Sequence, residues 1–286
     1  MGHATGAGVS RLSRPPLPAR AAAHAAVYAA ALSMLLPFAW MVLTSLKGDS
    51  EALTSDRFLP EVWRFDNYRR AVESAELGRF YSTTVVVAVL TTVLGVFYNA
   101  LAGYAFAKLR FRGRGVAFGF TLATMMLPAQ CFFVFAYLFA SSLGFIDNLQ
   151  ALVVPFLASG FGIFYMRQAI AAVPDSLIEA GRMDGLGEFD IFWHVVRPAV
   201  WPAVAALAIF TFMNSWNSFF WPLIVVDSTG MKTLPLAVAE LSSGQYVQSW
   251  PVRMAAATIL TVPVVVVFAV FQRAFVHGLA STGLKE

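Results

Sequence analysis

Residues 80–107 read FYSTTVVVAVLTTVLGVFYNALAGYAFA and contain no Asp, Glu, Lys or Arg. This run is longer than the roughly 20 residues that an α-helix needs to cross the hydrocarbon of a bilayer. Five more uncharged apolar runs occur, at residues 21–46, 115–146, 148–166, 198–226 and 254–272. One charge at the bilayer centre costs about 2.5–3.5 kcal/mol on insertion scales, so runs that avoid charge for this long indicate membrane spans.

The sequence therefore predicts an all-α polytopic membrane protein with six transmembrane helices. The expected helices lie near residues 24–46, 80–107, 116–140, 149–170, 199–224 and 253–275. The expected organisation is a tail over 1–23, one membrane domain over 24–275 with a long connecting loop at 171–198, and a second tail over 276–286.

The composition of the 286 residues excludes two other classes. Apolar residues make up 58% of the chain and charged residues 13%, against roughly 25% charged in soluble domains. This composition disfavours a soluble enzyme and excludes a disordered chain. Twenty Lys and Arg less sixteen Asp and Glu leave a charge of +4, which basic loops explain without a nucleic-acid partner. The single cysteine, Cys131, excludes an intrachain disulfide and a cysteine-based metal site.

Basic residues in the short connections predict the orientation. The N-terminal tail carries Arg11, Arg14 and Arg20 without an acid, residues 108–114 carry four basic residues, and the link 141–148 carries none. Because cytoplasmic loops are enriched in Lys and Arg, both termini and the 108–115 link are expected in the cytoplasm. The loop 47–79 would then lie outside, although it holds six basic and seven acidic residues.

The expected spans offer no source of energy. They contain no Asp or Glu to bind a driving ion, and the chain has no G-x-x-x-x-G-K-[ST] phosphate cradle. A chain that moves a solute under these conditions is either a passive channel or is driven by another protein. A membrane enzyme is disfavoured, because Asp184, Glu188 and Asp190 lack the histidines or paired geometry of a reactive site.

Neutral polar residues mark a candidate solute pathway. Phe210, Asn214, Asn217 and Trp221 recur at i, i+4, i+7 and i+11, which places them on one face of a continuous helix. Amides and aromatic rings together suit a polyhydroxylated solute, with the ring against C–H faces and the amide bonding hydroxyls. Further candidates of this type are Tyr98, Asn99 and Gln130. The alternative is that the amides bond neighbouring helices and the rings only pack.

The longest polar interruption, residues 174–202, reads PDSLIEAGRMDGLGEFDIFWHVVRPAVWP. Ser176 and Glu179 fit a capping box, and Gly185 and Gly187 supply a turn. An apolar stripe follows at Phe189, Phe192, Trp193 and Val196. This pattern predicts a helix–turn–helix outside the membrane whose apolar stripe requires a protein groove or the membrane interface to cover it.

This segment resembles the EAA loop of binding-protein-dependent ABC importers. The matching residues are Glu179-Ala180-Gly181, Asp184-Gly185 and Val196-Arg197-Pro198, with Gly181 where the pattern has Ala. Other elements resemble the same family in order along the chain: Phe65-Asp66-Asn67-Tyr68, Gly103–Ala107, Met126-Leu127-Pro128, Phe210–Phe212 with Trp216-Asn217, and Thr233-Leu234-Pro235. Together they are similar to carbohydrate-importer permeases, specifically the maltose-type second permease.

The resemblance implies a subunit of the bacterial inner membrane that works within an assembly. Its partners would be a second permease, two ATPase subunits that hold ATP and Mg²⁺, and an extracytoplasmic solute-binding protein. The residues implied in ATPase coupling are Glu179, Ala180, Gly181, Asp184, Gly185, Phe189 and Phe192. Contact with the binding protein is implied for Gly244, Gln245 and Tyr246. No catalysis and no cofactor are expected on this chain, and a passive facilitator remains the alternative.

Overall fold

The computed structural model describes residues 17–74, 77–242 and 249–283, and the regular structure in these ranges is helical. The all-α prediction is therefore confirmed. The long helices are α1 (Leu17–Ser45), α4 (Leu77–Lys108), α12 (Trp201–Trp216) and α15 (Trp250–Gly283). The shorter α-helices are α2 (Asp49–Thr54), α3 (Asp66–Ser74), α5 (Arg114–Met125), α6 (Phe133–Ser142), α7 (Leu149–Val153), α8 (Gly160–Ala171), α9 (Asp175–Met183), α10 (Glu188–Ile191), α11 (Arg197–Ala199), α13 (Phe220–Val225) and α14 (Leu234–Ser242). Between them lie the 3₁₀ turns η1 (Ala129–Phe132), η2 (Val154–Phe156) and η4 (Thr229–Met231), and a π turn, η3 (Phe192–Val196).

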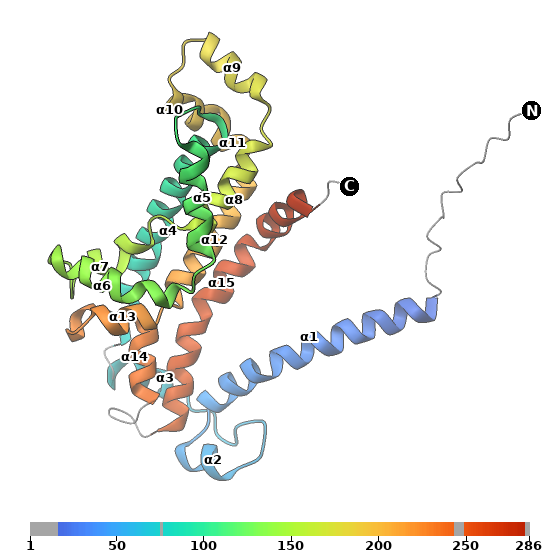
Figure 1. Cartoon of the computed structure of the whole chain (residues 1–286). Coiled ribbons are helices and arrows are strands. Elements are labelled where there is room, and N and C mark those ends of the chain that lie inside the picture. The colour runs from blue at the N-terminus through green and yellow to red at the C-terminus, as the bar shows by residue number, and fades with distance from the viewer. Residues whose placement is uncertain (1–16, 75–76, 243–248, 284–286) are drawn as a thin grey trace, which may run out of the picture.

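The helices form an elongated bundle with two different ends. Figure 1 shows α9, α10 and α11 gathered at one end, and α2 and α3 at the other, while α1 projects sideways from the second end. Among the described residues, three helices are long and apolar enough to cross a membrane, and up to six spans result if each bent helix pair counts as one. The expected six spans agree with this upper number.

Several of the expected spans are broken rather than continuous. The expected helix 116–140 bends by 109° between α5 and α6, where Pro128 lacks the N–H that would continue the helix. The expected helix 149–170 bends by 44° ahead of α8. The expected helix 199–224 ends at Trp216 and resumes as α13, because Pro222 cannot donate to the carbonyl of Ser218.

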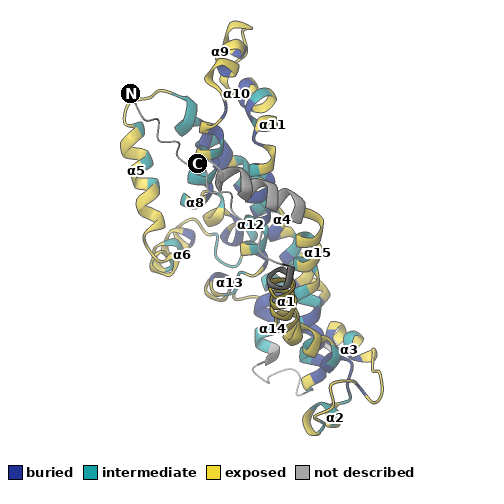
Figure 2. Cartoon of the chain, turned by 90° about the vertical axis from the view of Figure 1, so that its right-hand side faces the viewer, coloured by how far each residue is buried: buried dark blue, intermediate teal, exposed yellow. Residues whose placement is uncertain are grey.

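Helix α4 occupies the centre of the bundle and packs against α8 and α12. Two glycines permit the close packing of α4 and α8, Gly103 against the α8 backbone and Gly162 against a side chain of α4. A Cβ on Gly103 would lie 2.7 Å from Cβ of Met166, and one on Gly162 would lie 2.7 Å from Cγ of Asn99. Figure 2 shows buried residues concentrated along α4 and its neighbours, whereas α5 and most of α1 are exposed.

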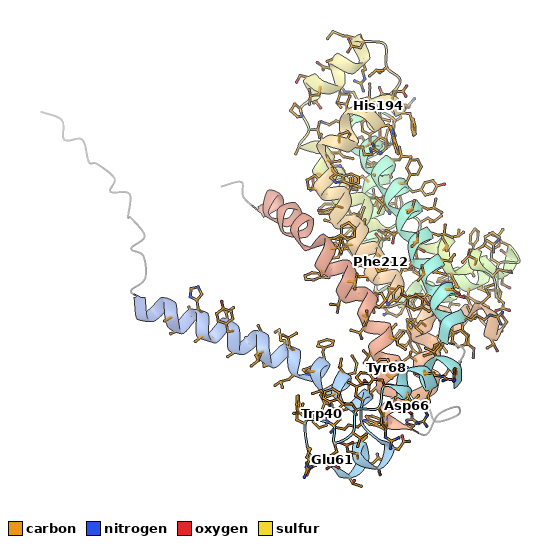
Figure 3. The ribbon with its side chains drawn as sticks, turned by 180° about the vertical axis from the view of Figure 1, so that it is seen from behind. Trp40, Glu61, Asp66, Tyr68, His194 and Phe212 are labelled. Carbon is orange, nitrogen blue, oxygen red and sulfur yellow. The ribbon has the colours of Figure 1, made fainter. Side chains whose placement is uncertain are left out.

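The base of α1 is tied to α3 by Asn67 and Tyr68. The Asn67 amide donates to the carbonyl of Ser45 at 2.9 Å and to that of Lys47 at 2.8 Å, so it caps the end of α1. The Tyr68 hydroxyl lies 2.7 Å from Oγ of Ser45. Figure 3 shows Tyr68 at this end of the bundle with Trp40, and His194 at the opposite end. This end of α1 is fixed, whereas residues 21–40 contact little of the chain.

We predict that Gly103→Ala destabilises the protein, because overpacking against the α8 backbone costs about 1–3 kcal/mol. Gly119→Ala in α5 is the matched control, since a Cβ there meets nothing within 4 Å. The measurement is the thermal unfolding midpoint of both variants in detergent. Equal midpoints for the two variants would contradict the close approach of α4 and α8.

Candidate functional site

A cavity of about 410 Å³ lies between α4, α8, α12 and α13, and its volume falls in the range of small-molecule sites. The lining residues are Val87, Thr91, Asn99, Leu152, Phe156, Ser159, Phe161, Leu207, Phe210, Thr211, Asn214, Ser215, Ser218, Trp221, Pro222 and Thr233. Each of these sixteen residues is uncharged. The wall therefore combines apolar and aromatic surface with hydroxyls and amides.

This lining favours an uncharged solute that carries hydroxyl groups. Hydroxyls and amides exchange hydrogen bonds with neutral polar groups, whereas a charge moved from water into such a cavity would lose hydration without gaining a counter-charge from this chain. Two rings form one aromatic corner: Phe210 of α12 meets Phe161 of α8 edge to face, with centroids 5.9 Å apart. Aromatic faces of this kind can pack against the C–H faces of a solute.

The structure brings four of the seven pathway candidates together. The cavity is lined by Asn99, Phe210, Asn214 and Trp221, whereas Asn217, Tyr98 and Gln130 are not among its lining residues. The predicted shared helical face is wrong, because α12 ends at Trp216 and Asn217 sits in the break before α13. Asn214 and Asn217 each donate to the carbonyl four residues earlier, Phe210 at 2.9 Å and Met213 at 2.8 Å.

Trp221 supports the cavity wall more than it offers polar chemistry. Its side chain is only 2% exposed, and its indole N–H donates to the carbonyl of Ala151 at 2.8 Å. The rings of Phe133 and Phe156 pack against it at centroid distances of 5.6 and 6.1 Å. The indole N–H of Trp221 is therefore used within the protein, as the alternative of packing and bonding to neighbouring helices predicted.

Hydroxyl residues of the cavity were missed from the sequence. They are Thr91, Ser159, Thr211, Ser215, Ser218 and Thr233. Val87, Thr91 and Asn99 recur at multiples of four residues along α4, a spacing that could have revealed Thr91. Thr233 could not have been found this way, because it reaches the cavity from the turn before α14.

Asn99 has a structural role at the edge of the cavity. Its Oδ1 accepts from the backbone N–H of Ser159 at 2.9 Å, and its amide donates to the carbonyl of Leu157 at 3.3 Å. These bonds satisfy backbone groups at the break ahead of α8, where helical bonding is interrupted. Asn99 thus joins α4 to α8 beside the lining.

The predicted capping box at the other end of the molecule is wrong. Helix α9 begins at Asp175 after Pro174, without a side-chain cap, so Ser176 and Glu179 do not form a reciprocal pair. Asp175 instead accepts from Nζ of Lys108 at 2.6 Å, and the same Nζ donates to the carbonyl of Val173 at 2.6 Å. The hydrogen bond from Lys108 holds the pKa of the Asp175 carboxyl below its usual value. Glu179 is exposed and free of the capping role.

The turn between α9 and α10 depends on two glycines. Gly185 has φ +80°, a left-handed conformation that favours glycine. Gly181 is buried, and a Cβ there would lie 3.1 Å from Cγ1 of Ile191, so the close packing of α9 on α10 explains Gly in place of Ala. The remaining coupling candidates of this region, Ala180 and Asp184, are exposed.

The apolar stripe that follows the turn is divided between two faces. Phe192 is 2% exposed and Val196 is buried, and both belong to the core beneath α9 and α10. Phe189 is 56% exposed and stacks on Trp193 at a centroid distance of 6.3 Å. Phe189 is therefore available to a partner protein, whereas Phe192 could act only through its neighbours.

Glu188 joins three helices. The Tyr104 hydroxyl of α4 donates to its Oε2 at 2.6 Å, and Nε of Arg182 in α9 donates to its Oε1 at 2.8 Å. The hydrogen bond from Arg182 and then that from Tyr104 hold the pKa of Glu188 below its usual value, so the carboxylate stays ionised into mild acid.

Beside Glu188, a groove of about 670 Å³ separates α9 from the link between α4 and α5. The charged residues of its lining are Lys108, Arg110, Arg114, Asp175, Glu179, Arg182 and Glu188.

The candidates for contact with a binding protein, Gly244, Gln245 and Tyr246, lie outside the described residues. Their role stays a prediction.

His194 is exposed, and its Nδ1 lies 3.1 Å from the carbonyl oxygen of Asp190.

Known proteins share both the sequence and the fold. The family described as "Binding-protein-dependent transport system inner membrane component" matches residues 99–281. The arabinooligosaccharides transport system permease protein AraQ of Bacillus subtilis is 33% identical over 258 residues, which cover 89% of this chain and 92% of AraQ. The lactose transport system permease protein LacG of Rhizobium radiobacter is 31% identical over 250 residues, 87% of this chain and 91% of LacG.

A solved structure supports the fold independently. A chain of a bacterial ABC transporter involved in the import of the acidic polysaccharide alginate superposes with a TM-score of 0.82. The match covers 92% of this chain and 99% of that chain at 24% sequence identity. The broken helices and the helix–turn–helix thus belong to an architecture already seen in a transporter.

We predict that Asn214→Ala alters solute transport by about three- to tenfold, since one hydrogen bond to a solute contributes about 0.5–1.5 kcal/mol. Asn217→Ala is the matched control, because it removes the same side chain and the same kind of backbone bond outside the cavity lining. The measurement is initial uptake by cells that express each variant at equal levels. Equal uptake by both variants would move the solute contact away from this cavity.

Proposed function

Because the chain belongs to the family of binding-protein-dependent transport system inner membrane components, we propose that it forms half of the pathway of an ATP-driven importer. The solute is a sugar or a related polyhydroxylated compound. The cavity carries this proposal, because its neutral hydroxyls, amides and rings match such a solute. The relatives named for arabinooligosaccharides and lactose support a saccharide.

A second permease completes the pathway. Support comes from α1, whose membrane-length stretch Ala21–Ser45 has none of its most apolar window buried within this chain. A helix held only at its base packs on lipid or on another subunit. A paired subunit would use this surface.

Two ATPase subunits supply the energy and hold ATP and Mg²⁺. The helices α9 and α10 suit their docking, because they project from the bundle with Glu179 and Phe189 exposed. Sequence resemblance assigns this segment to ATPase coupling, and the exposed positions support that assignment. The family is one of transport components rather than enzymes, and we expect no hydrolysis by this chain alone.

In the bilayer, the α9 end faces the cytoplasm together with both termini. The basic residues of the 108–114 link support this orientation, since they lie beside α9. The end with α2, α3 and α14 then faces the solute-binding protein outside the inner membrane. A passive channel would share the uncharged cavity but would have no use for a projecting helix–turn–helix.

We predict that Glu179→Lys lowers recovery of the ATPase with the permease about tenfold or more, because like charges brought together at an interface cost several kcal/mol. Glu73→Lys is the control, since Glu73 is exposed at the opposite end of the bundle. The measurement is ATPase recovered with tagged permease from membranes, together with hydrolysis by the purified material.

Two results would count against this proposal. One is full ATPase recovery with Glu179→Lys, which would remove Glu179 from the interface. The other is the absence of any ATPase from the unsubstituted permease, which would favour a passive channel.

A further inference from the structure

Helix α4 connects the cavity to the helices that dock the ATPase. Val87, Thr91 and Asn99 line the cavity, and Tyr104 lies on the same helix closer to α9. At 1.5 Å per residue, Thr91 and Tyr104 are roughly 20 Å apart along the axis. A displacement of the α9 end of α4 would therefore reach the cavity wall, provided that the docking helices and α4 move together.

The turn between α9 and α10 is a point at which the movement of α9 could be uncoupled from that of α4. Gly185 has a left-handed backbone conformation, and Gly187 is the N-cap residue before α10. Since glycine restricts the backbone least, this turn is the place where the last residues of α9 could move relative to α10 and α4. To pass movement from α9 to α4, the structure needs one bond across the turn and another from the turn to α4.

Glu188 provides both bonds at once. Its Oε1 accepts from Arg182 on the other side of the turn at 2.8 Å, and its Oε2 accepts from Tyr104 of α4 at 2.6 Å. Such charge-assisted hydrogen bonds are shorter and roughly twice as strong as neutral ones. Tyr104 is itself fixed, because it is 3% exposed and its ring packs against Phe192 at a centroid distance of 5.7 Å.

A second bond holds the start of α9. Lys108, one turn beyond Tyr104, bonds both Asp175 and the carbonyl of Val173. Its side chain is almost buried. Both ends of α9 are thus attached to the last turn of α4, one through Lys108 and the other through Arg182 and Glu188.

We propose that Tyr104, Glu188 and Arg182 are positioning residues that make α4, α9 and α10 one rigid lever, through which movement of the ATPase reaches the solute cavity. This inference rests on the proposed function. Tyr104 and Glu188 act through α4 and do not touch ATP or solute. Loss of the bond therefore leaves ATP hydrolysis intact while less solute moves for each ATP.

The test uses the complete importer, purified with its co-expressed partner subunits and reconstituted in proteoliposomes. The variants are Tyr104→Phe, Glu188→Ala and the double substitution, and the readout is ATP hydrolysed per solute molecule taken up. We expect at least a threefold rise in this ratio for each single variant with the ATPase still bound. The double variant should raise the ratio no further than the stronger single variant, because Tyr104→Phe and Glu188→Ala interrupt the same connection.

Tyr165→Phe is the matched control. Tyr165 of α8 packs on the same core cluster, and among the described residues its hydroxyl has no hydrogen-bond partner, so its removal breaks no bond. We expect Tyr165→Phe to hydrolyse as much ATP per solute molecule taken up as the unsubstituted importer does. An equal rise in Tyr165→Phe would mean that any core change has the effect, and would overturn the proposal.

Other outcomes are equally decisive. An unchanged ratio in Tyr104→Phe and Glu188→Ala would overturn the lever, as would loss of the bound ATPase in both, because the pair would then belong to the docking interface. Failure of the proposed function has a separate signature: the unsubstituted importer would show no ATP-dependent uptake at all.

Discussion

The close approach of α4 and α8 is the constraint on which the rest of the structure depends. Gly103 lets the two backbones meet at a distance that no larger residue allows, and Gly162 leaves room for the Asn99 side chain against α8. Asn99 then bonds the carbonyl of Leu157 and the N–H of Ser159, which would otherwise be unsatisfied inside an apolar bundle. The pair fixes one wall of the cavity, and because α9 follows α8 after three residues, it also fixes where α9 and α10 leave the bundle.

A division of labour between subunits follows from this arrangement. The cavity holds neutral groups, and in the proposed function the work of transport is supplied by the ATPase subunits. In the proposed function the exposed face of α9 and α10 contacts the ATPase, and α4 joins this face to the cavity. The chain thus combines a cavity that binds solute with helices that connect this cavity to the ATPase, as the proposed half of an ATP-driven pathway requires.

The sequence predicted what local chemistry dictates. Uncharged runs located the spans because a charge in hydrocarbon is costly, and Gly185 marked a turn because the left-handed conformation favours glycine. The helical face from Phe210 to Trp221 failed, because the break at Asn217 depends on how Pro222 and its surroundings interrupt helical bonding. The capping box at Ser176 failed because Lys108, distant in sequence, engages Asp175 where α9 begins. The bond from Tyr104 to Glu188 joins positions 84 residues apart, which no local pattern reveals.

Solute accumulation against a concentration gradient tests the central claim most directly. Proteoliposomes would contain either this chain alone or the chain with its second permease and ATPases, with binding protein and labelled neutral oligosaccharides supplied on the outer face. The account predicts that the inner concentration rises above the outer one only for the complete assembly and only with ATP. Accumulation by the chain alone, or mere equilibration by the complete assembly with ATP, would contradict it.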